Sequence, residues 1–299
     1  MQSERVAYVN GDIVPESRAT ISIHDRGFLQ GYSVFDTTRT FNHTIFKLDE
    51  HLERFYRSLK YARLEPNMDI SEMANTTMEV LRLNLPLIES TDDYWVTQRV
   101  SRGISGPDGE EPTVIIETVP LPFKARAKYY RDGMPVVIPS VRRTPPEVLS
   151  PRAKIQNYAN LVQAEFEVRE RNPDGWPILL DMNGNLSEGP GSNFFIVRDG
   201  AVITPREQFI LAGISRSTTI ELAQELGIET RQEDIDLYDA YTADESFVTS
   251  TSFCICPVNS INGSQVGDGE IPGPVTSRLL NAYSGLVGMD ISGQYLAHL

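Results

Sequence analysis

The sequence predicts an α+β protein built from two domains. Its first part contains short apolar runs separated by turn-forming pairs, together with two stretches of helical periodicity. Its second part also mixes predicted strands and helices. Between them lies a stretch with two prolines and a basic run, which is typical of an interdomain connection. We therefore expect a small α+β domain at residues 1–119, a connection at 120–132 and a larger domain at 133–299.

Turn signals and periodicity locate the elements of the small domain. Asn10-Gly11 predicts one hairpin, and Asn42-His43 predicts a second between strands at 31–41 and 44–47. In 48–64 the apolar residues recur near one helical face, and acidic residues at its start suit the helix dipole. Three further elements complete the domain: a helix at 70–83 and strands at 94–100 and 113–118.

The larger domain is expected to mix strands and helices in the same way. Gly227 is the kind of residue that ends a helix, and 182–185 has the composition of a hairpin turn. The predicted helices are 158–169, 215–226 and 274–286, and the predicted strands are 134–139, 176–181, 186–188, 193–197, 201–204, 246–249 and 254–258.

Composition narrows the class of protein. The chain has 299 residues with Lys+Arg 27 and Asp+Glu 41, a formal net charge of -14, and such a surface repels nucleic acid. No apolar run approaches the roughly 20 residues of a membrane-spanning helix, and two cysteines cannot build a disulfide scaffold. We therefore expect a cytoplasmic protein whose partners are neither nucleic acid nor membrane. Lysines are few, so a catalytic lysine has few candidates.

Metal and serine chemistry find little support in the sequence. Cys254 and Cys256 alternate along a predicted strand without a second pair of ligands, which favours two buried thiols over a zinc site. The histidines are scattered without metal-ligand spacing. The chain also lacks the nucleophile pattern GxSxG and the nucleotide-binding patterns GxGxxG and GxxxxGK[ST]. We expect no bound metal.

Lys154 is a candidate catalytic lysine because residues suited to the same chemistry follow it in the sequence. Lys154 precedes a predicted helix, and Tyr158 follows four residues later. Downstream, Glu188 borders a glycine-rich turn, 211–216 opens a helix whose N–H groups can bind an anion, and 249–252 is a run of hydroxyl residues. A lysine, a carboxylate, a helix N-terminus and a hydroxyl loop are the parts that an enzyme using pyridoxal 5'-phosphate (PLP) requires.

Seven blocks of sequence occur in a fixed order over about residues 6–287. The blocks are Tyr8-Val9-Asn10-Gly11; Asp25-Arg26-Gly27-Phe28 with Val34-Phe35-Asp36-Thr37; His51-Leu52-Glu53-Arg54-Phe55 with Ser58; Lys154 with Asn157-Tyr158; Leu186-Ser187-Glu188-Gly189; Leu211-Ala212-Gly213-Ile214-Ser215-Arg216; and Thr251 with Pro257-Val258. In this order they resemble the class IV aminotransferases, the fold-type IV family of PLP enzymes. The resemblance implies a small N-terminal α/β domain, a larger C-terminal domain with a barrel-like β core, and a homodimer.

The resemblance also implies roles for individual residues. Lys154 would hold PLP as a Schiff base and move the proton during catalysis, which requires a lowered pKa. Tyr158 would bind the phenolic oxygen of PLP, and Glu188 would bind its pyridine nitrogen. The other implied cofactor contacts are Arg54, Ile214, Ser215, Ser250 and Thr251 around the phosphate, and Leu211 against the ring.

The substrate pocket departs from the branched-chain members of this family. Those enzymes typically carry VFEGIR where this chain has Val34-Phe35-Asp36-Thr37-Thr38-Arg39, and Trp95-Val96-Thr97 lacks their Tyr-x-Arg. The VSRG run at 100–103 is closer to D-amino-acid aminotransferases. Strand alternation lets at most one of Arg99 and Arg102 face the pocket. The expected substrate-binding residues are Phe35, Thr37, Arg39, Trp95, Arg99 and Ser252.

These features predict a PLP-dependent transaminase that acts on small molecules. It would move an amino group from a D-amino acid or (R)-amine donor to a 2-oxo acid acceptor such as pyruvate, by a ping-pong mechanism. The main alternative is a branched-chain L-amino-acid aminotransferase that uses 2-oxoglutarate. An aminodeoxychorismate lyase on the same scaffold and a PLP-binding protein without turnover are two further alternatives.

Overall fold

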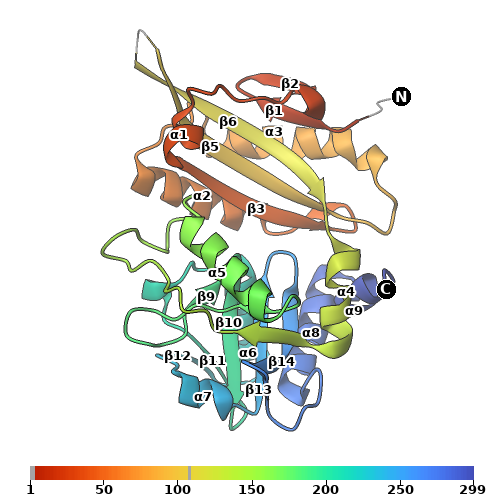
Figure 1. Cartoon of the computed structure of the whole chain (residues 1–299). Helices are drawn as coiled ribbons and strands as arrows, with labels where there is room; N and C mark the ends of the chain where they lie inside the picture. The colour runs from red at the N-terminus through yellow and green to blue at the C-terminus, as the bar shows by residue number, and fades with distance from the viewer. Residues whose placement is uncertain (1–3, 107–108) are drawn as a thin grey trace. The chain divides into compact units, whose positions relative to one another are not determined.

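The computed structural model describes residues 4–106 and 109–299 and divides the chain into two compact units (Figure 1). The N-terminal unit comprises Met1–Leu121 and Ala153–Asn157, and the C-terminal unit comprises Pro122–Arg152 and Tyr158–Leu299. The division differs from the expected domains in two places. The stretch expected to connect the domains lies almost wholly in the C-terminal unit, and a five-residue segment after it returns to the N-terminal unit.

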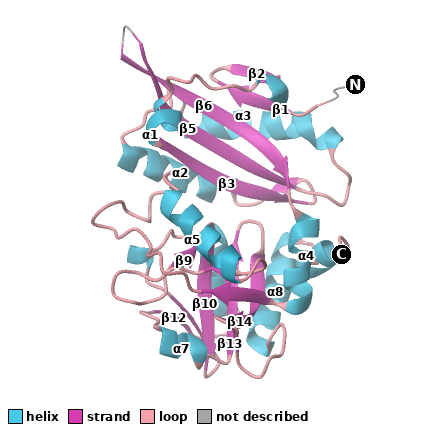
Figure 2. Cartoon of the chain, in the orientation of Figure 1, coloured by secondary structure: helices cyan, strands magenta, loops and turns pink. Residues whose placement is uncertain are grey.

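The N-terminal unit is built on an antiparallel sheet with the strand order β2-β1-β6-β5-β3-β4 (Figure 2). Its strands are β1 (Val6–Val9), β2 (Asp12–Pro15), β3 (Ser33–Phe41), β4 (Thr44–Ile45), β5 (Tyr94–Gly106) and β6 (Gly109–Pro120). Its helices are α1 (Arg26–Gln30), α2 (Leu48–Ala62) and α3 (Ile70–Asn84), with short 3-10 turns η1 (Glu16–Arg18) and η2 (Leu85–Leu87). β5 and β6 extend past the predicted strands into polar sequence because they pair with each other along their length.

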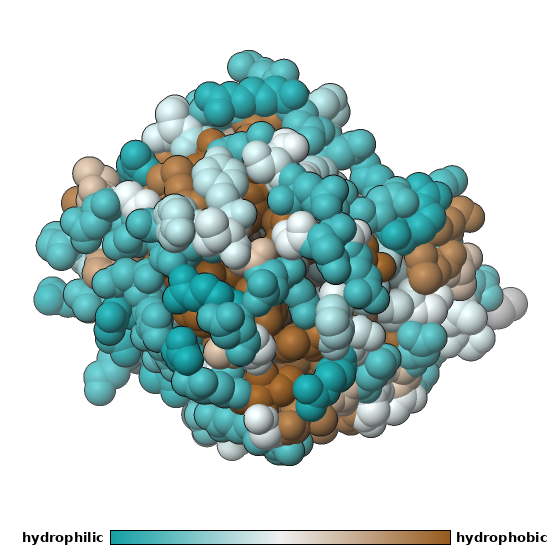
Figure 3. Space-filling model, turned by 90° about the horizontal axis from the view of Figure 1, so that it is seen from below, coloured by the Kyte–Doolittle hydropathy of each residue, from teal (hydrophilic) through white to brown (hydrophobic). Residues whose placement is uncertain are grey.

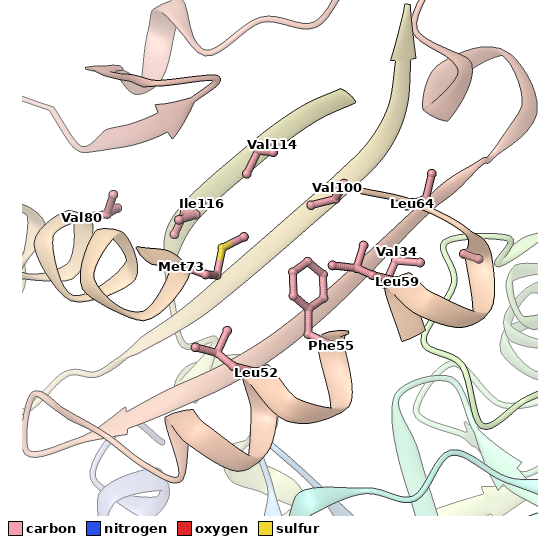
Figure 4. Packing of buried hydrophobic residues seen from close by; sticks show 11 residues of the cluster. Val34, Leu52, Phe55, Leu59, Leu64, Met73, Val80, Val100, Val114 and Ile116 are labelled. Atoms are coloured by element: carbon pink, nitrogen blue, oxygen red, sulfur yellow. The ribbon is translucent and has the colours of Figure 1, made fainter. Parts of the chain in front are cut away.

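Helices α2 and α3 cover one face of this sheet. Leu52, Phe55 and Leu59 of α2 project toward the strands that carry Val34 and Val100 (Figure 4). All five side chains are buried, and each such burial contributes about 1.5–3 kcal/mol. The helical periodicity predicted for this stretch is confirmed, and its apolar stripe is the core contact.

The predicted hairpin turns at Asn10-Gly11 and Asn42-His43 are confirmed. Asn10 and Gly11 have φ angles of 50° and 107°, and Asn42 and His43 have φ angles of 48° and 65°. Positive φ at both central residues matches the twist of the flanking strands, which is why asparagine and glycine occur in such turns. The second turn places β4 beside the end of β3.

The C-terminal unit is built on a second sheet with the strand order β12-β11-β10-β13-β14-β7-β8, to which β15 adds on β14 and β9 on β10 (Figure 2). This sheet is the β core expected for the larger domain. Its strands are β7 (Met134–Val137), β8 (Trp176–Pro177), β9 (Glu188–Gly189), β10 (Ser192–Arg198), β11 (Ala201–Thr204), β12 (Thr230–Gln232), β13 (Glu245–Ser250), β14 (Cys254–Ile261) and β15 (Ser264–Gln265).

The helices of this unit include three that the sequence predicts: α5 (Ala159–Arg171), α6 (Ile214–Glu225) and α8 (Pro274–Val287). Helices α6 and α8 contact each other and pack on β13 and β14. Four short elements were not predicted: α4 (Phe123–Asp132), the 3-10 turn η3 (Glu207–Phe209), α7 (Leu237–Tyr241) and α9 (Ile291–Leu296). The basic run expected to be a connection is therefore a helix, whose buried residues Phe123, Ala127 and Tyr130 form its apolar stripe.

The strand predicted at 176–181 is only partly present. β8 ends at Pro177, and beyond it a bridge joins Leu180 to Leu186. The carboxylate of Asp181 accepts hydrogen bonds from the backbone N–H groups of Asn183 and Asn185 at 2.8 and 2.9 Å. Backbone hydrogen bonds still join this stretch to 185–188: the N–H of Leu179 donates to the Glu188 carbonyl at 3.0 Å, and the N–H of Asp181 donates to the Asn185 carbonyl at 2.7 Å. The predicted hairpin is therefore present in an irregular form.

Across 4–106 and 109–299, no helix combines the length and apolarity that a bilayer crossing requires, and no group of three or more His, Cys, Asp or Glu side chains is arranged to hold a metal ion. Cys254 and Cys256 are buried thiols, as expected. Hydrophilic residues cover most of the face in Figure 3, with smaller groups of hydrophobic residues between them.

Candidate active site

The residues singled out from sequence divide between the two units. The N-terminal unit holds Phe35, Thr37, Arg39, Arg54, Trp95, Arg99 and Lys154. The C-terminal unit holds Tyr158, Glu188, Leu211, Ile214, Ser215, Ser250, Thr251 and Ser252.

Lys154 is fixed by backbone pairing with the start of β3. The N–H of Phe35 donates to the Lys154 carbonyl at 3.1 Å, and the N–H of Gln156 donates to the Ser33 carbonyl at 2.9 Å. The N–H of Lys154 itself donates to Oγ of Ser58 at 3.1 Å. Its ammonium then lies 4.6 Å from the ring centre of Phe35. The lysine is therefore held by strand-like contacts ahead of the predicted helix.

Beside it, Arg54 and His51 share the carboxylate of Asp36. Nε and Nη2 of Arg54 donate to Asp36 at 2.8 and 2.7 Å, and Nδ1 of His51 lies 2.8 Å from the same carboxylate. All three residues are buried. Burial raises the pKa of Asp36, but Arg54 and His51 outweigh it and hold this pKa far below its usual range. The cluster is thus an ionised carboxylate that orients the Arg54 guanidinium.

The pKa of His51 is lowered from its ordinary value of 6.5. Burial is the main cause, and the positive charges of Arg54 and Lys154 lower it further, against the raising effect of Asp36. Neutral His51 must donate from Nδ1, because an ionised carboxylate can only accept. Ser58 links the cluster to the lysine, since its hydroxyl donates to the Arg54 carbonyl at 3.0 Å while accepting from Lys154.

The sheet face opposite α2 and α3 carries the pocket residues expected from β3 and β5. Register pairs Phe35 with Arg99, Thr37 with Thr97 and Arg39 with Trp95. The hydroxyls of Thr37 and Thr97 lie 3.0 Å apart. Odd-numbered residues of both strands therefore share one face.

The three candidate arginines have different surroundings. Arg39 is buried, with Nε on the Thr40 carbonyl and Nη2 3.7 Å from Asp93, at the far end of β3 from Lys154. Arg102 pairs with Glu110 near the β5–β6 tip. Arg99 lies 5.4 Å from the ring centre of Phe35, the same ring that Lys154 contacts. Arg99 and Lys154 therefore contact the same aromatic ring, whereas the contacts of Arg39 with Thr40 and Asp93 lie at the other end of β3.

In the C-terminal unit, Glu188 is held on both of its carboxylate oxygens. Oε1 accepts from Nε of Arg143 at 2.8 Å, and Oε2 accepts from the N–H of Leu211 at 2.9 Å and from Asn193 at 3.4 Å. The same amide of Asn193 donates to the Leu211 carbonyl at 2.9 Å. Since each carboxylate oxygen has two lone pairs, Oε1 retains capacity for a further donor.

Helix α6 carries residues that the sequence predicts to bind an anion. It begins at Ile214 after Gly213, which makes no side-chain cap, so its first-turn N–H groups have no capping side chain and can donate to an anion. Ser215 is buried, with its hydroxyl 3.5 Å from that of Tyr283. Ser250 and Ser252 lie in the turn after β13 with their hydroxyls 3.2 Å apart, and Thr251 lies between them.

Sequence reasoning assigned no role to several residues of these sites. Arg143 and Asn193 contact Glu188, and Asp36 and His51 hold Arg54. Arg126 of α4 donates to the Ser252 hydroxyl. Asp36, His51 and Asn193 lie within or beside the sequence blocks, and this position could have identified them as candidates. Arg126 and Arg143 come from segments without a motif.

The donor groups fit PLP. An amine suits its aldehyde, a buried carboxylate suits its protonated ring nitrogen, and N–H groups with hydroxyls suit its phosphate. A Cβ on Gly213 would lie 2.2 Å from Oδ1 of Asn193, so the backbone entering α6 packs directly on the side chain that contacts Glu188. The mixed α/β units and these donors together define an enzyme of the PLP-dependent class.

Comparison with known proteins indicates the same class of enzyme. A family model described as amino-transferase class IV matches residues 33–261. The chain is 36% identical over 278 residues to a putative branched-chain-amino-acid aminotransferase of Methanocaldococcus jannaschii, covering 91% of this chain and 93% of the relative. The structure of the Escherichia coli branched-chain amino acid aminotransferase matches with a TM-score of 0.87 at 32% identity, over 95% of both chains.

Two structures of the T.th. branched-chain amino acid aminotransferase each match with a TM-score of 0.85. One is complexed with N-(5'-phosphopyridoxyl)-L-glutamate, at 27% identity over 96% of both chains. The other is complexed with 4-methylvaleric acid, at 28% identity over 97% of this chain and 96% of that one. The chain therefore belongs to the class IV aminotransferases, and it is a PLP-dependent transaminase.

Proposed function

We propose that this enzyme transfers the amino group of a branched-chain L-amino acid to 2-oxoglutarate. The observation that carries the proposal is the similarity, over more than nine-tenths of the chain, to enzymes named for branched-chain amino acids. The two T.th. complexes add support, since one contains an L-glutamate adduct and the other an apolar branched acid. The donor expected from the pocket sequence, a D-amino acid or (R)-amine, has no such support.

Within this proposal Lys154 is the catalytic base. Bound PLP would supply a ring that withdraws electrons from the substrate Cα. Nζ of Lys154 would take the proton from Cα and return it on the cofactor side, while Ser58 and β3 hold the lysine backbone in place. The Phe35 ring, whose centre lies 4.6 Å from the ammonium, provides an apolar contact for the lysine side chain.

Other residues would bind the cofactor and orient the substrate. Glu188 would accept the ring N–H, and Tyr158 would bind the phenolic oxygen. Arg54, the first turn of α6 and the hydroxyl turn would hold the phosphate, and Leu211 would lie against the ring. Thr37, Trp95 and Ser252 remain proposed contacts for the substrate.

A screen of donors and acceptors tests the proposal. The PLP-loaded enzyme is offered L-leucine, L-isoleucine, L-valine, D-alanine and (R)-1-phenylethylamine, each with 2-oxoglutarate and with pyruvate, and the new amino acid is quantified. We expect turnover of the three branched-chain donors with 2-oxoglutarate. Turnover of D-alanine or the amine in place of L-leucine would overturn the assignment.

We further propose a homodimer in the cytoplasm. The segment before β3 exposes large apolar side chains, including Ile23 at 72% and Phe28 at 66%, and such a cluster is typical of a subunit contact. Sedimentation equilibrium should therefore give twice the chain mass of 33.5 kDa. A monomer at micromolar concentration would exclude this assembly.

A further inference from the structure

The hydroxyl turn, residues 250–252, belongs to a tight connection between β13 and β14. Ser250 pairs with Cys254 at the end of the β13–β14 ladder, so residues 251–253 close this hairpin. Cys254 has a φ angle of 57°, a left-handed conformation that residues other than glycine rarely adopt. A backbone of this kind persists only where neighbouring contacts hold it in place. The groups that hold the connection therefore determine where the hydroxyls of the turn lie.

Two tyrosines from neighbouring helices hold the backbone of this connection. Tyr295 of α9 donates its hydroxyl to the Ser252 carbonyl at 2.5 Å, and Tyr130 of α4 donates to the Phe253 carbonyl. These four residues are all buried, so both hydrogen bonds are largely shielded from water. A buried hydrogen bond that loses one partner leaves the other unsatisfied, which makes such contacts effective constraints on the backbone.

The peptide group between Ser252 and Phe253 is held at both of its ends. Its carbonyl accepts from Tyr295, and its N–H donates to Oγ of Ser250 at 3.0 Å. Because a peptide group is planar, it cannot rotate without disturbing both hydrogen bonds. The Ser250 hydroxyl also lies 3.2 Å from that of Ser252. The geometry of the turn around Thr251 is therefore coupled to the Tyr295 hydroxyl.

The ring of Tyr295 is positioned independently of its hydroxyl. It stacks on Tyr130 with the ring centres 4.5 Å apart, and its centre lies 4.9 Å from that of Phe123. These rings come from α4 and α9, which contact each other within the C-terminal unit (Figure 1). Aromatic packing of this kind remains when the hydroxyl is removed, so the hydrogen bond to Ser252 can be tested by itself.

We propose that Tyr295 is a positioning residue for the phosphate of PLP and acts through the hydroxyl turn. This inference rests on the proposed contacts of Ser250 and Thr251 with that phosphate. The Tyr295 hydroxyl keeps the peptide after Ser252 in one orientation, so the turn meets the phosphate without first rearranging. Such pre-organisation strengthens binding, because the turn is ordered during folding and not at the moment when the cofactor binds.

Fluorescence titration of the apoenzyme with PLP and with pyridoxal, which lacks the phosphate, tests the proposal. Tyr295→Phe removes the hydroxyl and keeps the stacked ring. The variant should bind PLP about fivefold more weakly, the scale of one lost neutral hydrogen bond, and bind pyridoxal within about twofold of the wild type. A general loosening of the fold would weaken both compounds alike, so the difference between them reports the phosphate contact.

Tyr94→Phe is the matched control. Tyr94 is buried in the N-terminal unit, and its hydroxyl donates to the Asn84 carbonyl at 3.1 Å. This variant loses the same kind of hydrogen bond away from the turn and should change neither dissociation constant. Thr251→Val removes a proposed phosphate contact directly and should weaken PLP while leaving pyridoxal unchanged. Thermal unfolding of each variant measures the cost in stability separately.

The outcomes separate this inference from the proposals on which it rests. Unchanged PLP affinity in Tyr295→Phe, or equal weakening of PLP and pyridoxal, would overturn the positioning role of Tyr295. Unchanged PLP affinity in Thr251→Val would show that Thr251 does not hold the phosphate and would overturn the inference at its basis. Neither result bears on the amino donor, because the titrations contain none, so the donor screen remains a separate test.

Discussion

The buried carboxylate of Asp36 organises the N-terminal half of the site. It holds the guanidinium of Arg54 through two hydrogen bonds and fixes the ring of His51 through a third. Removing one partner of such a cluster leaves an uncompensated charge, at a cost of about 3–5 kcal/mol. The position of Arg54, a proposed phosphate ligand, is therefore coupled to the protonation state of His51.

That histidine predicts a pH dependence of stability. The pKa of His51 is lowered in the folded state, so below about pH 6.5 the unfolded chain binds more protons than the folded chain. Stability contributed by neutral His51 is therefore present above pH 6.5 and decreases as the pH falls. His51→Gln should reduce the difference in unfolding free energy between pH 7.5 and pH 5.5, measured with urea. The exposed His24→Gln variant should retain the wild-type difference, and an identical difference in both variants would refute the assignment.

Lys154 carries the strongest prediction for activity. Lys154→Ala should lower kcat by at least the 10²–10⁴-fold typical of a lost general base and should abolish the visible absorbance of covalently held PLP. Stopped-flow kinetics and absorption spectra of the purified variant measure both effects. Lys60→Ala, at an exposed position on α2, is the matched control. Retention of covalent PLP by the Lys154 variant would show that another amine holds the cofactor.

At this scale the sequence could nominate residues but not their partners. Lys154 and Glu188 stand out because their residue types and neighbours suit PLP chemistry. The pairing of Arg39 with Asp93 could not be foreseen, since it joins a β3 residue to one just before β5, far apart in the sequence. For the same reason, the sequence contains no indication of where the long side chain of Arg39 would end.

At the scale of elements, the start of α6 depends on a glycine. A Cβ at Gly213 would approach Oδ1 of Asn193 to 2.2 Å, and Asn193 contacts both Glu188 and the Leu211 carbonyl. Gly213→Ala should therefore lower the affinity for PLP about tenfold, with a stability cost of about 1–3 kcal/mol from overpacking. Fluorescence titration of the apoenzyme with PLP measures the first effect.

Gly285→Ala is the control for that variant. It lies inside α8, where an added Cβ meets no atom within 4 Å. Alanine there should raise the unfolding free energy by about 0.5–1 kcal/mol and leave PLP affinity unchanged. Equal PLP affinity in the two alanine variants would argue against a role for the packing at Gly213.

Helices with a long apolar stripe were predictable, and short elements were not. Helices α2 and α3 each bury a single face, and such a face gives a periodic apolar pattern that can be read from the sequence. α4 also has such a stripe, at Phe123, Ala127 and Tyr130, but its flanking prolines and basic residues resemble a linker. β8 is shorter than the predicted strand because the pairing of 179–181 with 185–188 is irregular, and hydrophobicity does not register such a departure from a regular ladder.

At the scale of the whole molecule, charge sets solubility. The net charge of -14 at neutral pH corresponds to an isoelectric point of about 4.8. Repulsion between copies vanishes near that pH, so turbidity of a concentrated solution should be greatest close to pH 4.8 and low at pH 7.5. A solubility minimum far from pH 4.8 would mean that bound groups or buried charges dominate the net charge.

The division into units could not be deduced from composition alone. Prolines indicate where the chain leaves the N-terminal sheet, but no pattern in 153–157 predicts that this segment belongs to the N-terminal unit. That return is held by backbone hydrogen bonds to Ser33 and Phe35, by the Ser58 hydroxyl and by packing of Ile155 on the core, and these contacts follow no sequence motif. Topology of this kind becomes visible only in three dimensions.

The returning segment has a consequence for synthesis on the ribosome. The first 121 residues emerge before the lysine segment, so the edge of β3 at Ser33 and Phe35 lacks its partner until residues 153–157 have been translated. The nascent N-terminal unit therefore passes through a stage with an unfilled strand edge, which is a template for pairing with other chains. The reactive amine therefore belongs to the part of the N-terminal unit that is translated last.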